Sequence, residues 1–129
     1  SEVKVPVAGP VCISAMEDEV AVGCASGFVL IFQLISEQLI IRYKLKVGWA
    51  AFTIYIHPAR ILAVGTNTSK TFIYDLDELV EPKCVLDYTK ATCFSRIENV
   101  QHYYKMGVVY KNALAIGCES GMIRIIGII

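Results

Sequence analysis

The chain has 129 residues, enough for one ordinary domain, and its 12 basic and 12 acidic residues give a formal net charge of zero. Hydrophobic residues make up 55% of the sequence and charged residues only 19%, which argues against a disordered chain and against a nucleic-acid surface built on phosphate neutralisation. Arg42, Lys70 and Arg124 interrupt the apolar runs before they reach the ~20 residues of a membrane-spanning helix.

The first residues in chain order, 1–10, do not begin with Met and lack the charged-then-apolar pattern of a signal peptide. We interpret them as the outer strand of a preceding unit. An apolar segment at 11–16 then opens the first full unit, which continues with a strand–turn–strand segment at 20–32 and a more polar strand at 39–45. The alternation of polar and apolar residues in 39–45 indicates an outer, partly solvated strand.

The same order of segments returns twice. The second and third units consist of residues 51–56, 62–74 and 84–88, and of residues 92–97 and 114–126. Their strand–turn–strand segments begin at Val20, Leu62 and Leu114, so they are 42 and then 52 residues apart. Repeats spaced by roughly 40–50 residues are typical of propeller blades, each a four-stranded antiparallel sheet.

We therefore predict an all-β fold: a β-propeller fragment of four-stranded antiparallel blades that is part of a longer closed propeller. The expected division is an outer strand of a preceding blade in 1–10, one blade in 11–46, a second in 47–90 and an incomplete third in 91–129. Closed propellers have about four to eight blades, and an open set of about three would leave apolar faces in water. Either the native polypeptide is longer, which we favour, or a partner or a second copy supplies the missing blades.

The segment from Ile56 to Leu76 resembles the WD-repeat β-propeller family. It contains IHPARILAVGT followed by TFIYDL, and Tyr74–Asp75 stands where that family usually has Trp–Asp. The resemblance extends over almost the whole chain, although Phe32–Gln33 and Ile126–Gly127 replace this pair in the other copies and no Gly–His pair precedes a first strand. Because that family's polar network is incomplete here, we expect apolar burial, at about 25 cal/mol per Å², to hold the blades together.

Five cysteines, an odd number without any CxxC spacing, lie in apolar strand patterns: Cys12, Cys24, Cys84, Cys93 and Cys118. We interpret them as buried small hydrophobes, which indicates a reducing, intracellular compartment, cytoplasmic or nuclear. His57 and His102 have no Cys or carboxylate partner at metal-ligand spacing. The sequence also lacks a phosphate loop and a nucleophile elbow, so we expect no catalytic residue, no metal and no cofactor.

The rims of the propeller are the candidate binding site, because loops on a rigid frame commonly carry function. The longest connection runs from residue 98 to 111 and brings His102, Tyr103, Tyr104 and Lys105 to one rim. Tyr is enriched in protein interfaces because it buries a large area. The alternative is a hairpin or strand whose aromatic side chains pack on their own blade.

The opposite rim carries Trp49 and Lys70. Trp49 is the single Trp and follows Gly48 where one blade passes to the next, so it is either a partner anchor or a wedge between blades. Lys70 and Glu119 hold equivalent hairpin positions and are either partner contacts or solvated charges. The acidic run at 17–19 is interpreted as a solvated edge.

The leading functional hypothesis is a non-catalytic protein–protein interaction scaffold, a WD-like β-propeller segment within a larger multi-subunit assembly that seats other subunits or peptides on its rims. The alternative is a trafficking or signalling adaptor that contacts phosphoinositide membranes through a rim, although the arginines at 42, 60, 96 and 124 are never adjacent. A third class is an enzyme whose site lies in blades outside this chain. Nucleic-acid partners are not expected, and any membrane contact would be peripheral.

Overall fold

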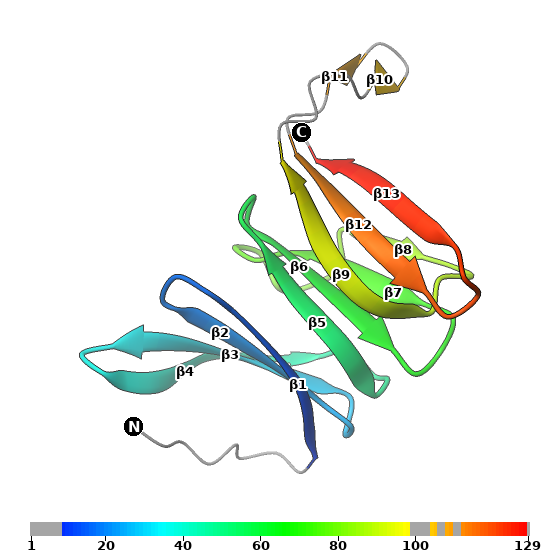
Figure 1. The fold of residues 1–129 in the computed structure, drawn as a ribbon. Coiled ribbons are helices and arrows are strands. Elements are labelled where there is room, and N and C mark those ends of the chain that lie inside the picture. Colours follow the sequence, from blue (N-terminus) through cyan, green and yellow to red (C-terminus); the bar gives the residue numbers. More distant parts are fainter. Residues whose placement is uncertain (1–8, 99–103, 106–107, 110–111, 129) are drawn as a thin grey trace.

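The computed structural model describes residues 9–98, 104–105, 108–109 and 112–128. They form three larger antiparallel sheets placed one after another and a separate two-stranded sheet (Figure 1). The first sheet has the strand order β1-β2-β3-β4 and the second β5-β6-β7-β8, whereas the third has the order β13-β12-β9. In the described residues, no helix is long and apolar enough to cross a membrane. The all-β prediction is confirmed, and the first two sheets have the four strands that it expected.

The strand bounds follow the repeats of the sequence. The first sheet contains β1 (Pro10–Met16), β2 (Glu19–Cys24), β3 (Phe28–Ile35) and β4 (Gln38–Lys46). The second contains β5 (Ala51–His57), β6 (Ile61–Thr66), β7 (Thr71–Asp75) and β8 (Cys84–Leu86). The third contains β9 (Ala91–Glu98), β12 (Asn112–Cys118) and β13 (Ile123–Ile128), and a separate small hairpin of β10 (Tyr104–Lys105) and β11 (Val108–Val109) lies between β9 and β12 in the chain (Figure 1).

The three sheets repeat the same local geometry where each inner strand begins. The register of β1 against β2 breaks between Pro10 and Cys12, and that of β5 against β6 breaks between Ala51 and Thr53. The pairing of β9 with β12 breaks at the same point, after Ala91. One backbone hydrogen bond precedes each break, with N···O distances of 2.7, 3.0 and 2.9 Å to the carbonyls of residues 9, 50 and 90. Pro10, Ala51 and Ala91 therefore hold equivalent positions.

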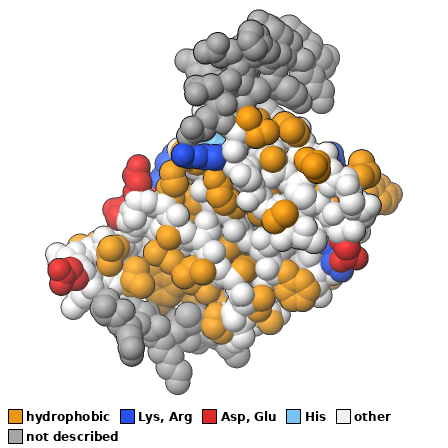
Figure 2. All heavy atoms as spheres, in the orientation of Figure 1, with side chains coloured by type: hydrophobic (Ala, Val, Ile, Leu, Met, Phe, Trp, Pro, Cys, Tyr) orange, Lys and Arg blue, Asp and Glu red, His pale blue; other side chains and the backbone are white. Residues whose placement is uncertain are grey.

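Several large hydrophobic side chains remain at the surface, and Figure 2 shows them gathered over the first sheet and again over the third. On the inner strand of the first sheet, Val11 is 49% exposed and Ile13 is 68% exposed. On the third sheet, Ile123 is 74% exposed and Ile125 is 42% exposed. These exposed residues lie on the two terminal sheets of the row.

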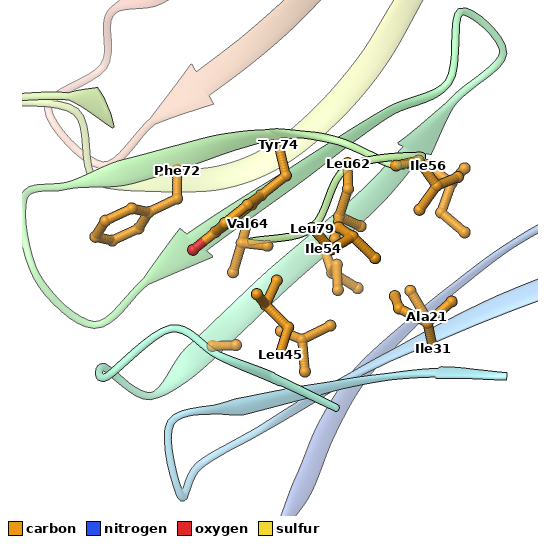
Figure 3. Close-up of a cluster of buried hydrophobic side chains, with 13 residues drawn as sticks. Ala21, Ile31, Leu45, Ile54, Ile56, Leu62, Val64, Phe72, Tyr74 and Leu79 are labelled. Atoms are coloured by element: carbon orange, nitrogen blue, oxygen red, sulfur yellow. The ribbon is translucent and has the colours of Figure 1, made fainter. Parts of the chain in front are cut away.

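The buried core lies between sheets, where the side chains of one sheet meet those of the next. Between the first and second sheets, Ala21, Ile31 and Leu45 face Ile54, Leu62 and other side chains of the second sheet (Figure 3). A second cluster contains Ala63 and Ile73 of the second sheet and Ala91, Leu114 and Ile116 of the third. The near-continuous apolar character of β6 and β7 in the second sheet is thus explained by cover on both faces.

Glycine is required at Gly23 and Gly65 because the neighbouring sheet comes very close. A Cβ at Gly23 would lie 2.9 Å from the Cβ of Ala51, and one at Gly65 would lie 3.0 Å from the Cβ of Ala91. Real Cβ atoms do not approach each other this closely, so a larger residue would push two sheets apart. The first residues of β5 and β9, Ala51 and Ala91, thus fit against a glycine of the preceding sheet.

The interpretation of the cysteines is wrong for two of the five. Cys84 and Cys93 are exposed, Cys12 and Cys118 are partly buried, Cys24 is buried, and all five are free thiols. Cys93 lies on β9, the inner edge strand of the third sheet. Cys84 lies on the short strand β8, at the outer edge of the second sheet. Their exposure follows from their positions at the margins of the sheets.

The outer strand of the second sheet is shorter than expected. Residues 84–88 were expected to form it, but β8 ends at Leu86. Tyr88 adopts φ = 54° and is 94% exposed. The outer strand expected in residues 1–10 lies almost entirely outside the described residues.

Candidate protein-binding rims

The antiparallel connections define two rims. The insertion rim contains the β1–β2 and β5–β6 turns, the β7–β8 connection and the segment between β9 and β12. The Trp49 rim contains the β2–β3, β6–β7 and β12–β13 turns, together with the connections that lead from β4 to β5 and from β8 to β9. Because successive strands run in opposite directions, the predicted site residues are divided between opposite edges of the molecule (Figure 1).

Trp49 lies at the Trp49 rim with 47% of its surface exposed. The preceding Gly48 has φ = 91°, and the amides of Val47 and Gly48 donate to the carbonyl oxygen of Gly27 at 2.9 and 3.0 Å. This backbone clamp fixes the connection at the end of the β2–β3 turn. The indole is therefore half exposed on a fixed backbone, an arrangement compatible with a partner anchor.

Four charged side chains of the Trp49 rim form two ion pairs. Lys70 Nζ lies 3.5 Å from Asp87 Oδ1, and Lys90 Nζ lies 3.0 Å from Glu119 Oε2. Exposed ion pairs of this kind contribute about 0–1 kcal/mol each to stability. They fix charge positions around the rim more than they stabilise the fold.

Tyr88 is a rim residue that the sequence reasoning missed. It lies in the same kind of connection as Trp49, its φ is positive, and its side chain is almost fully exposed. The polar residues on either side of it, Asp87 and Thr89, are the signal that would have placed it in a turn. Tyr88 adds a second large aromatic side chain to the rim that carries Trp49.

The insertion rim holds the remaining predicted site residues, and they are only partly described. Tyr104 and Lys105 form β10 and pair with Val109 and Val108 of β11. His102 and Tyr103 lie outside the described residues, and the side chains of Tyr104 and Lys105 are not described either. The backbone at 104–105 and 108–109 thus forms a two-stranded sheet separate from the third sheet.

A charged cluster connects the first and second sheets at the insertion rim. Glu19 is only 6% exposed, its Oε1 accepts a close hydrogen bond from Arg60 of the second sheet, and its Oε2 lies 3.4 Å from Arg42 Nη1. Arg60 also reaches Asp77 Oδ1 at 2.6 Å through Nη2 and Asp77 Oδ2 at 3.3 Å through Nε. Arg42 Nη2 donates to the carbonyl oxygen of Leu76 at 3.1 Å.

This cluster corrects two expectations. Glu19 does not belong to a solvated acidic edge, because two guanidinium groups neutralise it in a nearly buried position. Apolar burial is also not the only interaction that holds the sheets together, since Arg60 of the second sheet forms a charge-assisted hydrogen bond with Glu19 of the first. Within the second sheet, the side-chain hydrogen bonding of Arg60 to Asp77, together with the positive charges of Arg60 and Arg42, holds the pKa of Asp77 below its usual range. Arg60 is held at φ = 64°, a left-handed conformation that favours glycine.

His57 forms a second polar link, between the second and third sheets. Its Nδ1 accepts from the Ala59 amide at 3.0 Å, so the proton is on Nε2, which donates to the Ala113 carbonyl oxygen at 3.2 Å. Burial lowers the pKa of His57, the hydrogen bond to Ala113 opposes this, and the positive charge of Arg96 adds to the lowering. The imidazole is therefore neutral and structural. In the part of the chain that the structure describes, no group of three His, Cys, Asp or Glu side chains could hold a metal ion.

A hollow of about 370 Å³ opens at the insertion rim between the first two sheets. It is lined by Arg42, Tyr43, Leu76, Asp77, Glu78, Leu79 and Val80. Val80 is 77% exposed, whereas Leu76 at the base is fully buried. The hollow therefore offers an apolar floor with both signs of charge at its edge.

Solved structures with a similar fold include the following two proteins. Sqt1 of Saccharomyces cerevisiae, a WD40 propeller, matches all of this chain with a TM-score of 0.69 and 14% identity, and the match covers 34% of Sqt1. The computationally designed Ika4 protein matches 98% of this chain with a TM-score of 0.57 and 9% identity, over 96% of its own length. No family model and no curated protein matches the sequence. The chain thus has the fold of a partial WD-like β-propeller of about three blades, and it spans about a third of Sqt1.

Proposed function

We propose that this chain is a non-catalytic protein–protein interaction scaffold, a WD-like β-propeller segment that works within a larger multi-subunit assembly. Residues 11–46, 47–90 and 91–129 are its successive blades, the last one incomplete. Other blades come from a longer polypeptide or from another chain, and peptides or protein subunits bind at the rims. Free thiols are compatible with an intracellular compartment, cytoplasmic or nuclear.

The observation that carries this proposal is the pair of exposed aromatic side chains at one rim. Trp49 and Tyr88 both follow an outer strand, and each lies in or beside a positive-φ turn that fixes the backbone. Large aromatic side chains on a rigid backbone lose little conformational entropy on binding and are enriched among binding hot spots. Known propellers commonly use their rims in this way, which supports the same use here.

Affinity capture with the wild-type chain and matched variants tests the proposal. We expect W49A, Y88A and the double variant Y103A/Y104A to lose specific proteins from the captured set while keeping the far-UV circular dichroism of the wild type. I41A, which alters an apolar residue in the middle of β4 that is 46% exposed and lies away from both rims, is the control. If all variants capture the same proteins as wild type, the rim-binding proposal is wrong.

The arrangement of the arginines disfavours the phosphoinositide alternative. Arg42 and Arg60 come together at the insertion rim, but Glu19 and Asp77 already neutralise them. A lipid phosphate would have to displace a carboxylate that is nearly buried. The proposal is therefore not extended to lipid headgroups.

A further inference from the structure

The two rims carry opposite charge, although the chain as a whole is neutral. At the insertion rim of the first two sheets, acidic residues dominate the β1–β2 turn, the β3–β4 turn and the β7–β8 connection. At the Trp49 rim, basic residues outnumber acidic ones among the residues that the structure describes. The basic residues there are Lys44, Lys46, Lys70, Lys90 and Arg124, and the acidic ones are Asp87 and Glu119.

Two cations of the Trp49 rim are held in place by groups that carry no net charge. Arg124 Nη1 donates to the carbonyl oxygen of Asp87 at 3.3 Å and forms a close hydrogen bond to Thr89 Oγ1. Lys44 Nζ lies 4.3 Å from the centre of the Phe28 ring, a cation–π contact. Unlike the lysines of the two ion pairs, Arg124 and Lys44 are therefore positioned by partners that do not cancel their charge.

Cations also stand beside the exposed aromatic side chains of this rim. The two acceptors of Arg124 belong to the residues on either side of Tyr88. Lys46 is exposed, ends β4 and shortly precedes Trp49 in the chain. Each aromatic side chain thus has a positive charge in its neighbourhood, so the rim combines apolar area with positive charge.

A single turn fixes Trp49 and Tyr88 relative to each other. In the β6–β7 turn, the amide of Asn67 donates to the carbonyl oxygen of the residue after Trp49 at 3.0 Å. The carbonyl oxygen of Ser69 in the same turn accepts from the amide of the residue after Tyr88 at 2.8 Å. The two aromatic residues therefore flank one turn, and one short segment of a partner can contact both.

We propose that the Trp49 rim binds an acidic segment of a partner protein, with apolar side chains of the segment against Trp49 and Tyr88 and its carboxylates against Lys46 and Arg124. The inference rests on the proposed rim binding and adds the chemistry of the partner. Complementary charge steers a partner toward its site and suppresses wrong contacts. The acidic insertion rim would repel the same segment, so binding is confined to one rim.

A protein segment fits this rim better than a phosphate backbone or an anionic bilayer. Asp87 and Glu119 stand among the cations, where they pair with Lys70 and Lys90. Nucleic acids and anionic lipid surfaces present closely spaced negative charges, which would face these two carboxylates as well as the cations. A polypeptide can carry Asp or Glu only where the rim is positive and apolar residues elsewhere.

Selection of random dodecapeptides on the immobilised chain tests the chemistry of the partner. We expect the enriched sequences to be rich in Asp and Glu and to contain large apolar residues. In fluorescence anisotropy, W49A and Y88A should each weaken the binding of an enriched peptide by about tenfold or more. K46Q and R124Q, which remove a charge and keep a polar side chain, should each weaken it by about two- to fivefold at about 50 mM NaCl and have little effect at about 500 mM NaCl. K83Q, at the insertion rim, is the matched control and should bind as the wild type does.

The possible results distinguish this inference from the rim-binding proposal. Enriched peptides that are basic or uncharged but still require Trp49 would leave rim binding in place and overturn the acidic partner. If no peptide is enriched, or none depends on Trp49 or Tyr88, both proposals are wrong. Oligothymidylate or phosphatidylserine vesicles serve as competing probes. If either binds more tightly than the enriched peptides and loses binding in W49A and R124Q, the rim belongs to that ligand and the acidic segment is wrong.

Discussion

Replacing Gly65 by Ala tests whether the sheets are held at the distance that the structure gives. The new Cβ would lie 2.5 Å from Thr53 Cγ2, 3.0 Å from Ala91 Cβ and 3.2 Å from the Ala91 carbonyl oxygen. Ala91 belongs to the third sheet, so its atoms cannot move away without shifting that sheet. The Thr53 methyl is fixed on a β-branched side chain, which has few alternative rotamers.

The magnitude follows from two opposing terms. Overpacking in a dense core typically costs about 1–3 kcal/mol. Ala in place of Gly lowers the entropy of the unfolded chain and returns about 0.4–1 kcal/mol, since Gly65 does not need a positive φ. We therefore expect G65A to lower the free energy of unfolding by about 1–2 kcal/mol.

The assay is urea unfolding followed by far-UV circular dichroism and by the fluorescence of Trp49, the only Trp in the chain. T53S removes the methyl group that lies closest to the new Cβ, so the double variant T53S/G65A should be more stable than the sum of the single effects by about 0.5–1.5 kcal/mol. T53S alone is the matched control. Equal or greater stability of G65A, or strictly additive effects, would refute the close approach of the sheets.

The remaining predictions concern the two polar links between sheets. His57 is neutral in the folded chain, where its pKa is lowered from the ordinary value of 6.5. Near and below that pH the unfolded chain therefore binds more protons than the folded chain. The free energy of unfolding should then fall as the pH drops below 6.5. Urea midpoints in an H102N background should show this decline, and H57Q should remove it; an unchanged slope in H57Q contradicts the assignment. R60A leaves the nearly buried Glu19 with only Arg42 nearby. The free energy of unfolding should fall by about 1–3 kcal/mol, which is less than the full loss for a buried ion pair because Arg60 is partly exposed. Adding E19Q should recover much of this loss in the same urea assay, and no recovery would mean that Glu19 is not the charge that Arg60 neutralises.

The sheets were predictable because the strand signals are local. Apolar segments flanked by turn residues, such as 20–32 and 62–74, become β2–β3 and β6–β7 with little shift in their ends. The spacing of these segments along the chain also predicted that the same kind of sheet is repeated. These signals depend on residues a few positions apart, which sequence patterns capture well.

What could not be predicted depends on contacts between distant residues. The burial of Glu19 is set by Arg60, 41 positions later, so the acidic run at 17–19 alone suggested solvent. The exposure of Cys93 depends on whether another sheet covers β9, which the strand pattern does not contain. For the candidate site, the half-exposed Trp49 fits the expected rim position, whereas Tyr88 was assigned to a strand because its neighbours continue an apolar–polar alternation.

The route of the chain, in which the outer strand of each sheet leads directly to the inner strand of the next, has a consequence for synthesis on the ribosome. Every strand pairing within the first two sheets joins consecutive strands, so each of these sheets can form as soon as its last strand emerges. The most recently formed sheet then exposes an apolar face until the sheet that covers it has been translated. Nascent chains paused between sheets are therefore the species that chaperones have most reason to shield.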